Sequence, residues 1–297
     1  MNHPLDILRI LRPNQWTKNL VVLAAYFFAF GDQQQSLPSH TLARILVACA
    51  MFCLASSSIY IINDLHDAAA DRLHPTKRFR PIAAGRVSQA LAAGIAIILL
   101  AISLMGAARL APNFGLLVCV YVAMQAAYTY GLKKIALLDV FIIATGFVLR
   151  AAGGGLAIHV HVSPWLLVCA FLLALFLALC KRRHEKILLE DNAEGHRASL
   201  EYYNTKLLDQ LIAIVCAATI VSYSVYTLST ETIQKFGTSL LSLTIPFVIF
   251  GIFRYLDLVY RKDAGGRPEK TLLTDGILIV DLVLYGLCLL GIFTFTR

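Results

Sequence analysis

The chain has 297 residues, of which 58% are hydrophobic and only 15% are charged, and its formal net charge is +8. A soluble domain of this length needs more charge to cover its surface, so the composition excludes an ordinary water-soluble enzyme and indicates a polytopic membrane protein. The seven cysteines lie in apolar segments and form no CxxC pair, which argues against a disulfide framework or a cysteine-bound metal. No nucleic-acid partner is expected.

About nine apolar segments are long enough to be predicted as membrane-spanning helices, because roughly 20 apolar residues cross a bilayer. We therefore expect an all-α integral membrane protein whose single domain covers residues 1–297. In chain order the predicted spans are 17–31, 42–63, 88–110, 113–132, 136–158, 164–181, 207–229, 238–258 and 273–295.

The cations are unevenly distributed over the segments that join these spans. Most of the 26 Lys and Arg residues lie before the first span or in every second connection after it. By the positive-inside rule these segments face the cytoplasm. The sequence thus predicts a multi-pass protein of the inner (cytoplasmic) membrane, with its N-terminus in the cytoplasm and its C-terminus outside.

The densest charge cluster directly follows the second predicted span, in the segment 60–85, YIINDLHDAAADRLHPTKRFRPIAAG. At about 100° per residue on a helix, Tyr60, Asp64, Asp67 and Asp71 fall on one face, and Asn63 lies to one side. Carboxylates on one face repel one another unless a cation lies between them, and hard oxygen ligands that share phosphate oxygens are typical of Mg²⁺. The pattern predicts that Asn63, Asp64, Asp67 and Asp71 are both metal ligands and catalytic residues.

Cations that could bind phosphate lie close to this segment in the chain or at membrane depth. Arginine is suited to bidentate phosphate contacts, and ionisable groups inside a membrane usually face an internal cavity. We therefore predict a polyphosphate-binding cavity that opens to the cytoplasm. The alternative is a solvated helix end whose Asp and Arg side chains pair with one another. The cations concerned are Lys77, Arg78 and Arg80 after the acidic residues, Lys18 in the first span and Arg150 in the fifth.

A second charged stretch, rich in cations, follows the sixth predicted span at 181–203. Glu190 and Glu194 keep an ExxxE spacing within it. The GGG at 153–155 is expected to allow close helix packing rather than to bind phosphate, and Asp139 to form a hydrogen bond between helices. Further predicted substrate-binding residues lie at the end of the fourth span or in the second stretch: Lys133, Lys134, Lys181, Arg182, Glu185, Arg197 and Tyr202.

The pattern NDxxDxxxD, the nine spans and the charged stretch after the sixth resemble the UbiA superfamily of intramembrane prenyltransferases. Three segments further resemble its branch that transfers phosphoribosyl groups to polyprenyl phosphates: LRPNQWTKNLVVLAA at 11–25, the segment 60–85, and FRYLDLVYRKDAGGRPEKTLLTD at 253–275. The similarity extends along nearly the whole chain. It implies a UbiA-type helix bundle that holds Mg²⁺ and a diphosphate leaving group in a cytoplasmic active-site cavity.

The resemblance implies transfer of the 5-phosphoribosyl group from 5-phosphoribosyl 1-diphosphate to a polyprenyl phosphate such as decaprenyl phosphate. Diphosphate is released, and the product would serve the synthesis of cell-envelope arabinan or a related glycoconjugate. Tyr60 would then contact the donor, and Lys77, Arg78 and Arg80 would bind its phosphates, with Lys18 reaching the same cavity. Lys133 or Lys134 and Arg150 would bind the acceptor phosphate.

One departure separates the chain from the aromatic prenyltransferases of the superfamily, which share a second acidic motif after helix six. Here that region begins KRRHEK, a composition better suited to phosphate than to a second metal cluster. Two alternatives stay open: an aromatic prenyltransferase that uses a polyprenyl diphosphate donor, as in quinone pathways, and a transporter of a phosphorylated solute, which predicts inverted repeats. Membrane lipids are expected partners, and association into homo-oligomers is left open.

Overall fold

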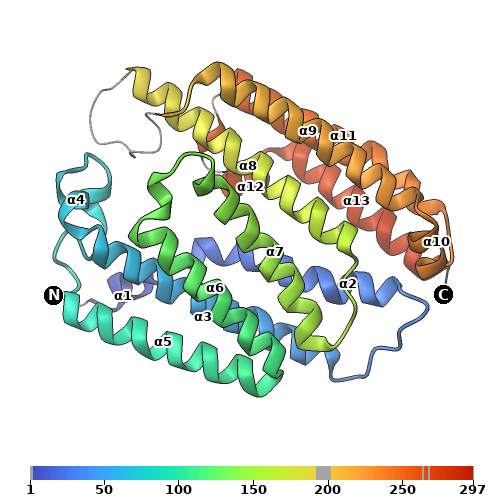
Figure 1. Cartoon of the computed structure of the whole chain (residues 1–297), viewed down its shortest axis with the longest axis horizontal. Helices are drawn as coiled ribbons and strands as arrows, with labels where there is room; N and C mark the ends of the chain where they lie inside the picture. Colours follow the sequence, from blue (N-terminus) through green and yellow to red (C-terminus); the bar gives the residue numbers. More distant parts are fainter. Residues whose placement is uncertain (1–2, 192–201, 263, 267, 297) are drawn as a thin grey trace.

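The structure, a computed structural model, describes residues 3–191, 202–262, 264–266 and 268–296 (Figure 1). All regular elements in these ranges are helices, so the prediction of an all-α protein is confirmed. In chain order they are α1 (Pro4–Ile10), the 3₁₀ helix η1 (Pro13–Leu23), α2 (Ala24–Gly31), α3 (Thr41–His66), α4 (Ala68–Leu73), η2 (Lys77–Phe79), α5 (Gln89–Leu110), α6 (Pro112–Tyr130), η3 (Leu132–Lys134), α7 (Leu138–Ile158), α8 (Pro164–Asp191), α9 (Thr205–Leu228), α10 (Thr230–Phe236), η5 (Leu240–Thr244), α11 (Ile245–Lys262), η6 (Ala264–Gly266), α12 (Pro268–Thr274) and α13 (Gly276–Phe295).

Within the described residues, seven helical segments are long and apolar enough to cross a membrane, so the chain is a multi-pass membrane protein. They are α3, α5, α7, α8, α9, α13 and the segment 240–261. The predicted count of nine is therefore not reproduced. The fourth predicted span is α6, whose 19 residues include the polar Asn113 and Gln125. The first predicted span, 17–31, falls on two consecutive helices, the 11-residue 3₁₀ helix η1 and the eight-residue α2. The helix η1 begins at a proline and carries polar side chains.

Of the four apolar cores in the described residues, α7 contributes buried side chains to two. One core joins the start of α7 to α8, α9, α11 and α13. The other joins the end of α7 to η1, α2, α3, α5 and α6. In Figure 1, α9, α11 and α13 accordingly lie on one side of α7, and α3 and α5 lie on the other.

Glycines let α7 approach its neighbours closely. A Cβ atom on Gly153 would lie 2.7 Å from the Phe52 ring of α3, and one on Gly154 would collide with the backbone oxygen of Val22 in η1. This close approach confirms the prediction that the GGG at 153–155 serves helix packing.

Candidate functional site

The acidic segment lies at the junction of α3 and α4. The helix α3 ends at His66, and Asp67 serves as its C-terminal cap and as the residue that precedes α4. The backbone turns continue through the junction, since the N–H of Asp67 donates to Asn63 O at 2.9 Å and that of Asp71 donates to Asp67 O at 2.8 Å. Asn63, Asp64, Asp67 and Asp71 therefore lie on successive turns.

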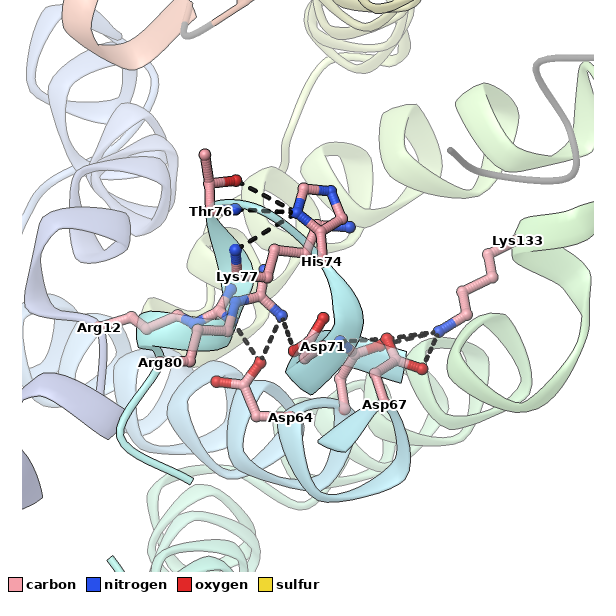
Figure 2. A network of polar contacts seen from close by, with 10 residues as sticks. Arg12, Asp64, Asp67, Asp71, His74, Thr76, Lys77, Arg80 and Lys133 are labelled. Carbon is pink, nitrogen blue, oxygen red and sulfur yellow. Dashed lines mark hydrogen bonds and ion pairs between the residues drawn. The ribbon is translucent and has the colours of Figure 1, made fainter. Parts of the chain in front are cut away.

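Asn63 and Asp67 form the first of two polar pairs at this junction. The amide nitrogen of Asn63 donates to Asp67 Oδ2 at 3.1 Å. The ammonium of Lys133, from η3, lies 2.9 Å from each carboxylate oxygen of Asp67 and 3.3 Å from Asn63 Oδ1. Figure 2 shows Lys133 reaching Asp67 from the neighbouring helix end. Three oxygen atoms thus face one cation that lies 66 residues from Asp67 in the chain.

Asp64 and Asp71 form the second pair, and both are buried. Arg80 Nη1 lies 3.0 Å from Asp64 Oδ1 and 2.7 Å from Asp71 Oδ2, so one guanidinium joins the two carboxylates (Figure 2). Arg12 also forms an ion pair with Asp64, and its guanidinium lies 5.2 Å from the centre of the Tyr60 ring. The buried charges of this pair are therefore compensated by two arginines.

The single acidic face predicted from helical periodicity is divided between these two pairs, because each pair attracts different cations. The described residues contain no group of three or more His, Cys, Asp or Glu side chains that could hold a metal ion. However, the oxygens of Asn63 and Asp67 already converge on one cation, and Mg²⁺ needs only one or two carboxylates when phosphates and waters complete its shell. The donor set of this pair therefore fits Mg²⁺. The metal-binding and catalytic roles of the four residues stay predictions.

The other cations predicted near the segment lie in the three 3₁₀ helices η1, η2 and η3. Lys77 and Arg78 are exposed in η2, where Arg78 lies 4.9 Å from the centre of the Phe79 ring. His74 Nδ1 accepts hydrogen bonds from the backbone N–H groups of Thr76 and Lys77 at 3.2 and 3.3 Å, which shapes the turn before η2 (Figure 2). Lys134 is exposed in η3 and Lys18 is half-buried in η1.

Arg150 is buried at membrane depth and joins three elements. Its guanidinium donates to Asn19 Oδ1 of η1 at 2.7 Å, to the Gly146 carbonyl of α7 at 2.8 Å and to the Tyr121 hydroxyl of α6 at 2.8 Å. It also lies 4.8 Å from the centre of the Tyr121 ring, a cation–π distance. These contacts hold α6, α7 and η1 together, and binding of the acceptor phosphate by Arg150 stays a prediction.

The second charged stretch begins with a buried ion pair between α7 and α8. Arg182 Nε donates to Asp139 Oδ2 at 2.8 Å, and Arg182 also pairs with Glu185. The Tyr203 hydroxyl donates to Asp139 Oδ1 at 2.8 Å and accepts from the N–H of Leu137 at 2.7 Å. Burial, with the bond to Asp139, raises the pKa of Tyr203 above its ordinary value, so the phenol stays protonated. The interhelical hydrogen bond expected of Asp139 is confirmed.

The remaining predicted residues of this stretch are more peripheral or not described. Lys181 is half-buried and Tyr202 is exposed. Arg197 and Glu194 lie outside the described residues, as does the side chain of Glu190.

The third segment that carries the family resemblance packs against the start of this stretch through η6. A Cβ atom on Gly265 would lie 3.0 Å from the carbonyl oxygen of Cys180, and one on Gly266 would lie 2.5 Å from the His184 ring. Glycine is therefore required for η6 to lie this close to α8.

The structure also brings in residues that sequence reasoning missed: Arg12, Asn19 and Tyr121. Arg12 lies in the segment RPNQWTKN, which also contains Lys18, and its partner Asp64 is 52 residues away. The available signal was its place beside the apolar first span, in a segment that already carries the family resemblance. Asn19 and Tyr121 carried no signal of their own beyond being polar groups inside apolar segments.

The chain is similar to known proteins along nearly its whole length. Residues 20–273 match the model of the UbiA prenyltransferase family. A decaprenyl-phosphate phosphoribosyltransferase of Mycolicibacterium smegmatis is 39% identical over 282 residues, which cover 92% of this chain and 87% of that protein. One of Corynebacterium glutamicum is 36% identical over 288 residues, 95% of this chain and 85% of that protein.

The fold agrees as well. The structure of a UbiA homolog from Archaeoglobus fulgidus, bound to GPP and Mg²⁺, matches with a TM-score of 0.70 at 20% identity and covers 98% of both chains. From the family match and from relatives more than 35% identical over nearly the whole length, the chain belongs to the UbiA prenyltransferase family.

Proposed function

We propose that the protein transfers the 5-phosphoribosyl group of 5-phosphoribosyl 1-diphosphate to a polyprenyl phosphate and releases diphosphate. The observation that carries this proposal is the 39% identity, over 92% of the chain, to a decaprenyl-phosphate phosphoribosyltransferase. The site supports it, because Arg12, Arg80 and Lys133 gather positive charge at one helix end. A donor with three phosphate groups and a lipid phosphate acceptor both require such cations.

Asn63 and Asp67 would hold Mg²⁺, with Asp64 and Asp71 beside them. This assignment is supported by the convergence of their oxygens on the Lys133 ammonium. When bound, Mg²⁺ would neutralise negative charge on the diphosphate leaving group. The UbiA homolog from A. fulgidus was solved with bound Mg²⁺, which supports the proposal that a protein of this fold binds a divalent metal.

The reaction forms a bond between a phosphate oxygen of the lipid and C1 of ribose while the bond from C1 to the diphosphate oxygen breaks. Attack from the face opposite the leaving group inverts the configuration at C1. A phosphate monoester is already anionic near neutral pH, since its second pKa is about 6, so no strong general base is needed. Arg80, with Lys77 and Arg78 of η2, would bind the negative charge that builds on the departing diphosphate, which lowers the energy of the transition state.

The proposed site faces the cytoplasm of a cell whose inner membrane the protein spans. The cation distribution supports an N-terminus in the cytoplasm and a C-terminus outside. The water-soluble donor would enter from the cytoplasm, and the polyprenyl chain would stay in the membrane, because its transfer to water is unfavourable.

The test is to incubate the purified protein in detergent with Mg²⁺, decaprenyl phosphate and donor labelled in its ribose. We expect label in the extracted lipid, and no label when EDTA is present. Absence of label with several polyprenyl phosphates, together with turnover of a polyprenyl diphosphate and an aromatic acceptor, would instead place the protein among the aromatic prenyltransferases.

A further inference from the structure

The ammonium group of Lys133 contacts the same oxygen atoms of Asn63 and Asp67 that would bind the proposed metal ion. Its ammonium lies equally close, at 2.9 Å, to both oxygens of Asp67, and it also contacts Asn63 Oδ1. The Lys133 side chain is only 13% exposed, and that of Asp67 is 28% exposed. The ion pair is therefore partly shielded from water, which strengthens it relative to a surface pair.

The same oxygens cannot serve Lys133 and a metal ion together. Mg²⁺ binds oxygen at about 2.0–2.1 Å, and an ammonium held on the same oxygens would lie within a few ångströms of a doubly charged ion. Asp64 and Asp71 pair with arginines instead, and in the described contacts these arginines touch neither Asp67 nor Asn63. Metal binding to Asn63 and Asp67 therefore does not require the arginines to move. Lys133 is thus the cation that must leave.

We infer that Lys133 is a displaceable counter-ion, which keeps the Asn63–Asp67 pair assembled until metal binds and then donates to the diphosphate of the donor. In this role Lys133 serves the donor, and Lys134 is left as the lysine for the acceptor phosphate. The inference rests on the metal site proposed above. A lysine suits this exchange, because its charge sits on a flexible four-carbon stem with three donors.

The backbone around Lys133 is held by hydrogen bonds within η3, from the N–H of Lys134 to Gly131 O at 2.9 Å and from that of Ile135 to Leu132 O at 3.1 Å, and by contacts at the start of α7. We therefore expect the side chain, rather than the backbone, to move. The N–H of Leu137, directly before α7, is bound by the Tyr203 hydroxyl, and Asp139 in the first turn of α7 is held by Arg182. Leu137 also has a φ of 65°, a conformation that leucine rarely adopts and that such contacts must stabilise.

Displacement of Lys133 predicts that metal and diphosphate bind cooperatively. Metal alone must break the ion pair between Lys133 and Asp67, whereas metal with diphosphate gives the released ammonium a new anionic partner. Because of Lys133, the site should bind metal more tightly when diphosphate is present than when it is absent.

The test uses Mn²⁺ as the metal probe, followed by its electron paramagnetic resonance signal, with and without inorganic diphosphate. It compares the wild-type protein with Lys133→Met, Lys133→Arg and the control Lys206→Met, which removes an exposed lysine at the start of α9. We expect Lys133→Met to bind Mn²⁺ alone about fivefold more tightly or better, and to lose the gain in affinity that diphosphate gives the wild type. Lys133→Arg and Lys206→Met should keep the wild-type gain.

Acetylation of lysines, read by mass spectrometry, reports the movement directly, with Lys206 as an internal reference. Mn²⁺ should raise the reactivity of Lys133, and added diphosphate should lower it again. An unchanged or weaker Mn²⁺ affinity in Lys133→Met, while Asp67→Asn abolishes Mn²⁺ binding, overturns the inference and leaves the proposed function intact. If Asp67→Asn has no effect on Mn²⁺ binding either, the metal site itself is wrong, and the inference fails with it.

Discussion

Arg80 is the side chain that most directly stabilises the buried half of the acidic segment. It joins Asp64 and Asp71, which are 3% and 4% exposed, and only Asp64 has a second arginine partner among the described contacts. Loss of a cation beside a buried carboxylate leaves a charge that is neither solvated nor paired. The Arg80 side chain is 28% exposed, however, so water reduces the loss.

Substitution of Arg80→Gln should therefore lower the free energy of unfolding by about 1–3 kcal/mol, a value at or below the range for a fully buried pair. A denaturant titration in mixed micelles measures it. The double variant Arg80→Gln/Asp71→Asn should recover part of the loss, because the unpaired carboxylate is then neutral. Losses that simply add would show that the two side chains are not coupled.

The residues of the acidic segment were predictable from the sequence, but their partners were not. Asn63, Asp64, Asp67 and Asp71 were selected by charge and helical spacing, which are local properties. Lys133 meets Asp67 across 66 residues, and Arg12 meets Asp64 across 52. Such pairings depend on how the helices are arranged, which local charge and helical spacing do not reveal.

The contact between α7 and η1 depends on the absence of a side chain at Gly154. A methyl group there would collide with the carbonyl of Val22, which is backbone and cannot rotate away. We expect Gly154→Ala to reduce the free energy of unfolding by about 1–3 kcal/mol, as overpacking of a core does. The matched control is Gly286→Ala in α13, where an added Cβ meets no atom within 4 Å. Gly286→Ala should leave the free energy of unfolding unchanged or raise it, since alanine favours a helix. Equal losses of unfolding free energy in both variants would show that the contact with Val22 is not the cause.

The hydroxyl of Tyr203 restrains the backbone of the connection between α6 and α7. Its hydroxyl joins the Leu137 N–H to Asp139, so Tyr203→Phe should free the connection while leaving the apolar ring in place. We expect faster amide hydrogen exchange in the peptide 131–138, with exchange in α9 unchanged. Tyr202→Phe, at an exposed position, is the control. Unchanged exchange in both variants would show that the bond does not restrain the connection.

Most helices were predictable because their apolar segments are long and uninterrupted. The spans expected at 88–110, 136–158 and 273–295 correspond closely to α5, α7 and α13. The span expected at 17–31 is not among the seven long apolar helices, and its segment is divided between η1 and α2. Hydropathy does not register that Asn19 in this segment is buried against Arg150. Polar groups inside an apolar segment find partners only when the whole bundle is assembled.

The orientation of the whole molecule is predicted from the distribution of its cations, and this prediction can be tested independently of activity. A reporter phosphatase that is active only outside the cytoplasm should be active when fused after Arg297 and inactive when fused after Asp191. The reverse pattern would place the acidic segment on the outer side, away from a cytoplasmic donor, and would contradict the proposed function.

In the proposed function, phosphoribosyl transfer depends on a metal held at the junction of α3 and α4. The most direct measurement is the initial rate of label transfer to decaprenyl phosphate, at saturating Mg²⁺, by the wild type, by Asp67→Asn and by Asp209→Asn. Asp209 pairs with Arg183 and lies outside the site, so its variant is the matched control. We predict a loss of about 100-fold or more for Asp67→Asn, loss of wild-type activity on chelation, and a near wild-type rate for Asp209→Asn. Transfer by Asp67→Asn at the wild-type rate would show that the reaction does not depend on a metal held by Asp67.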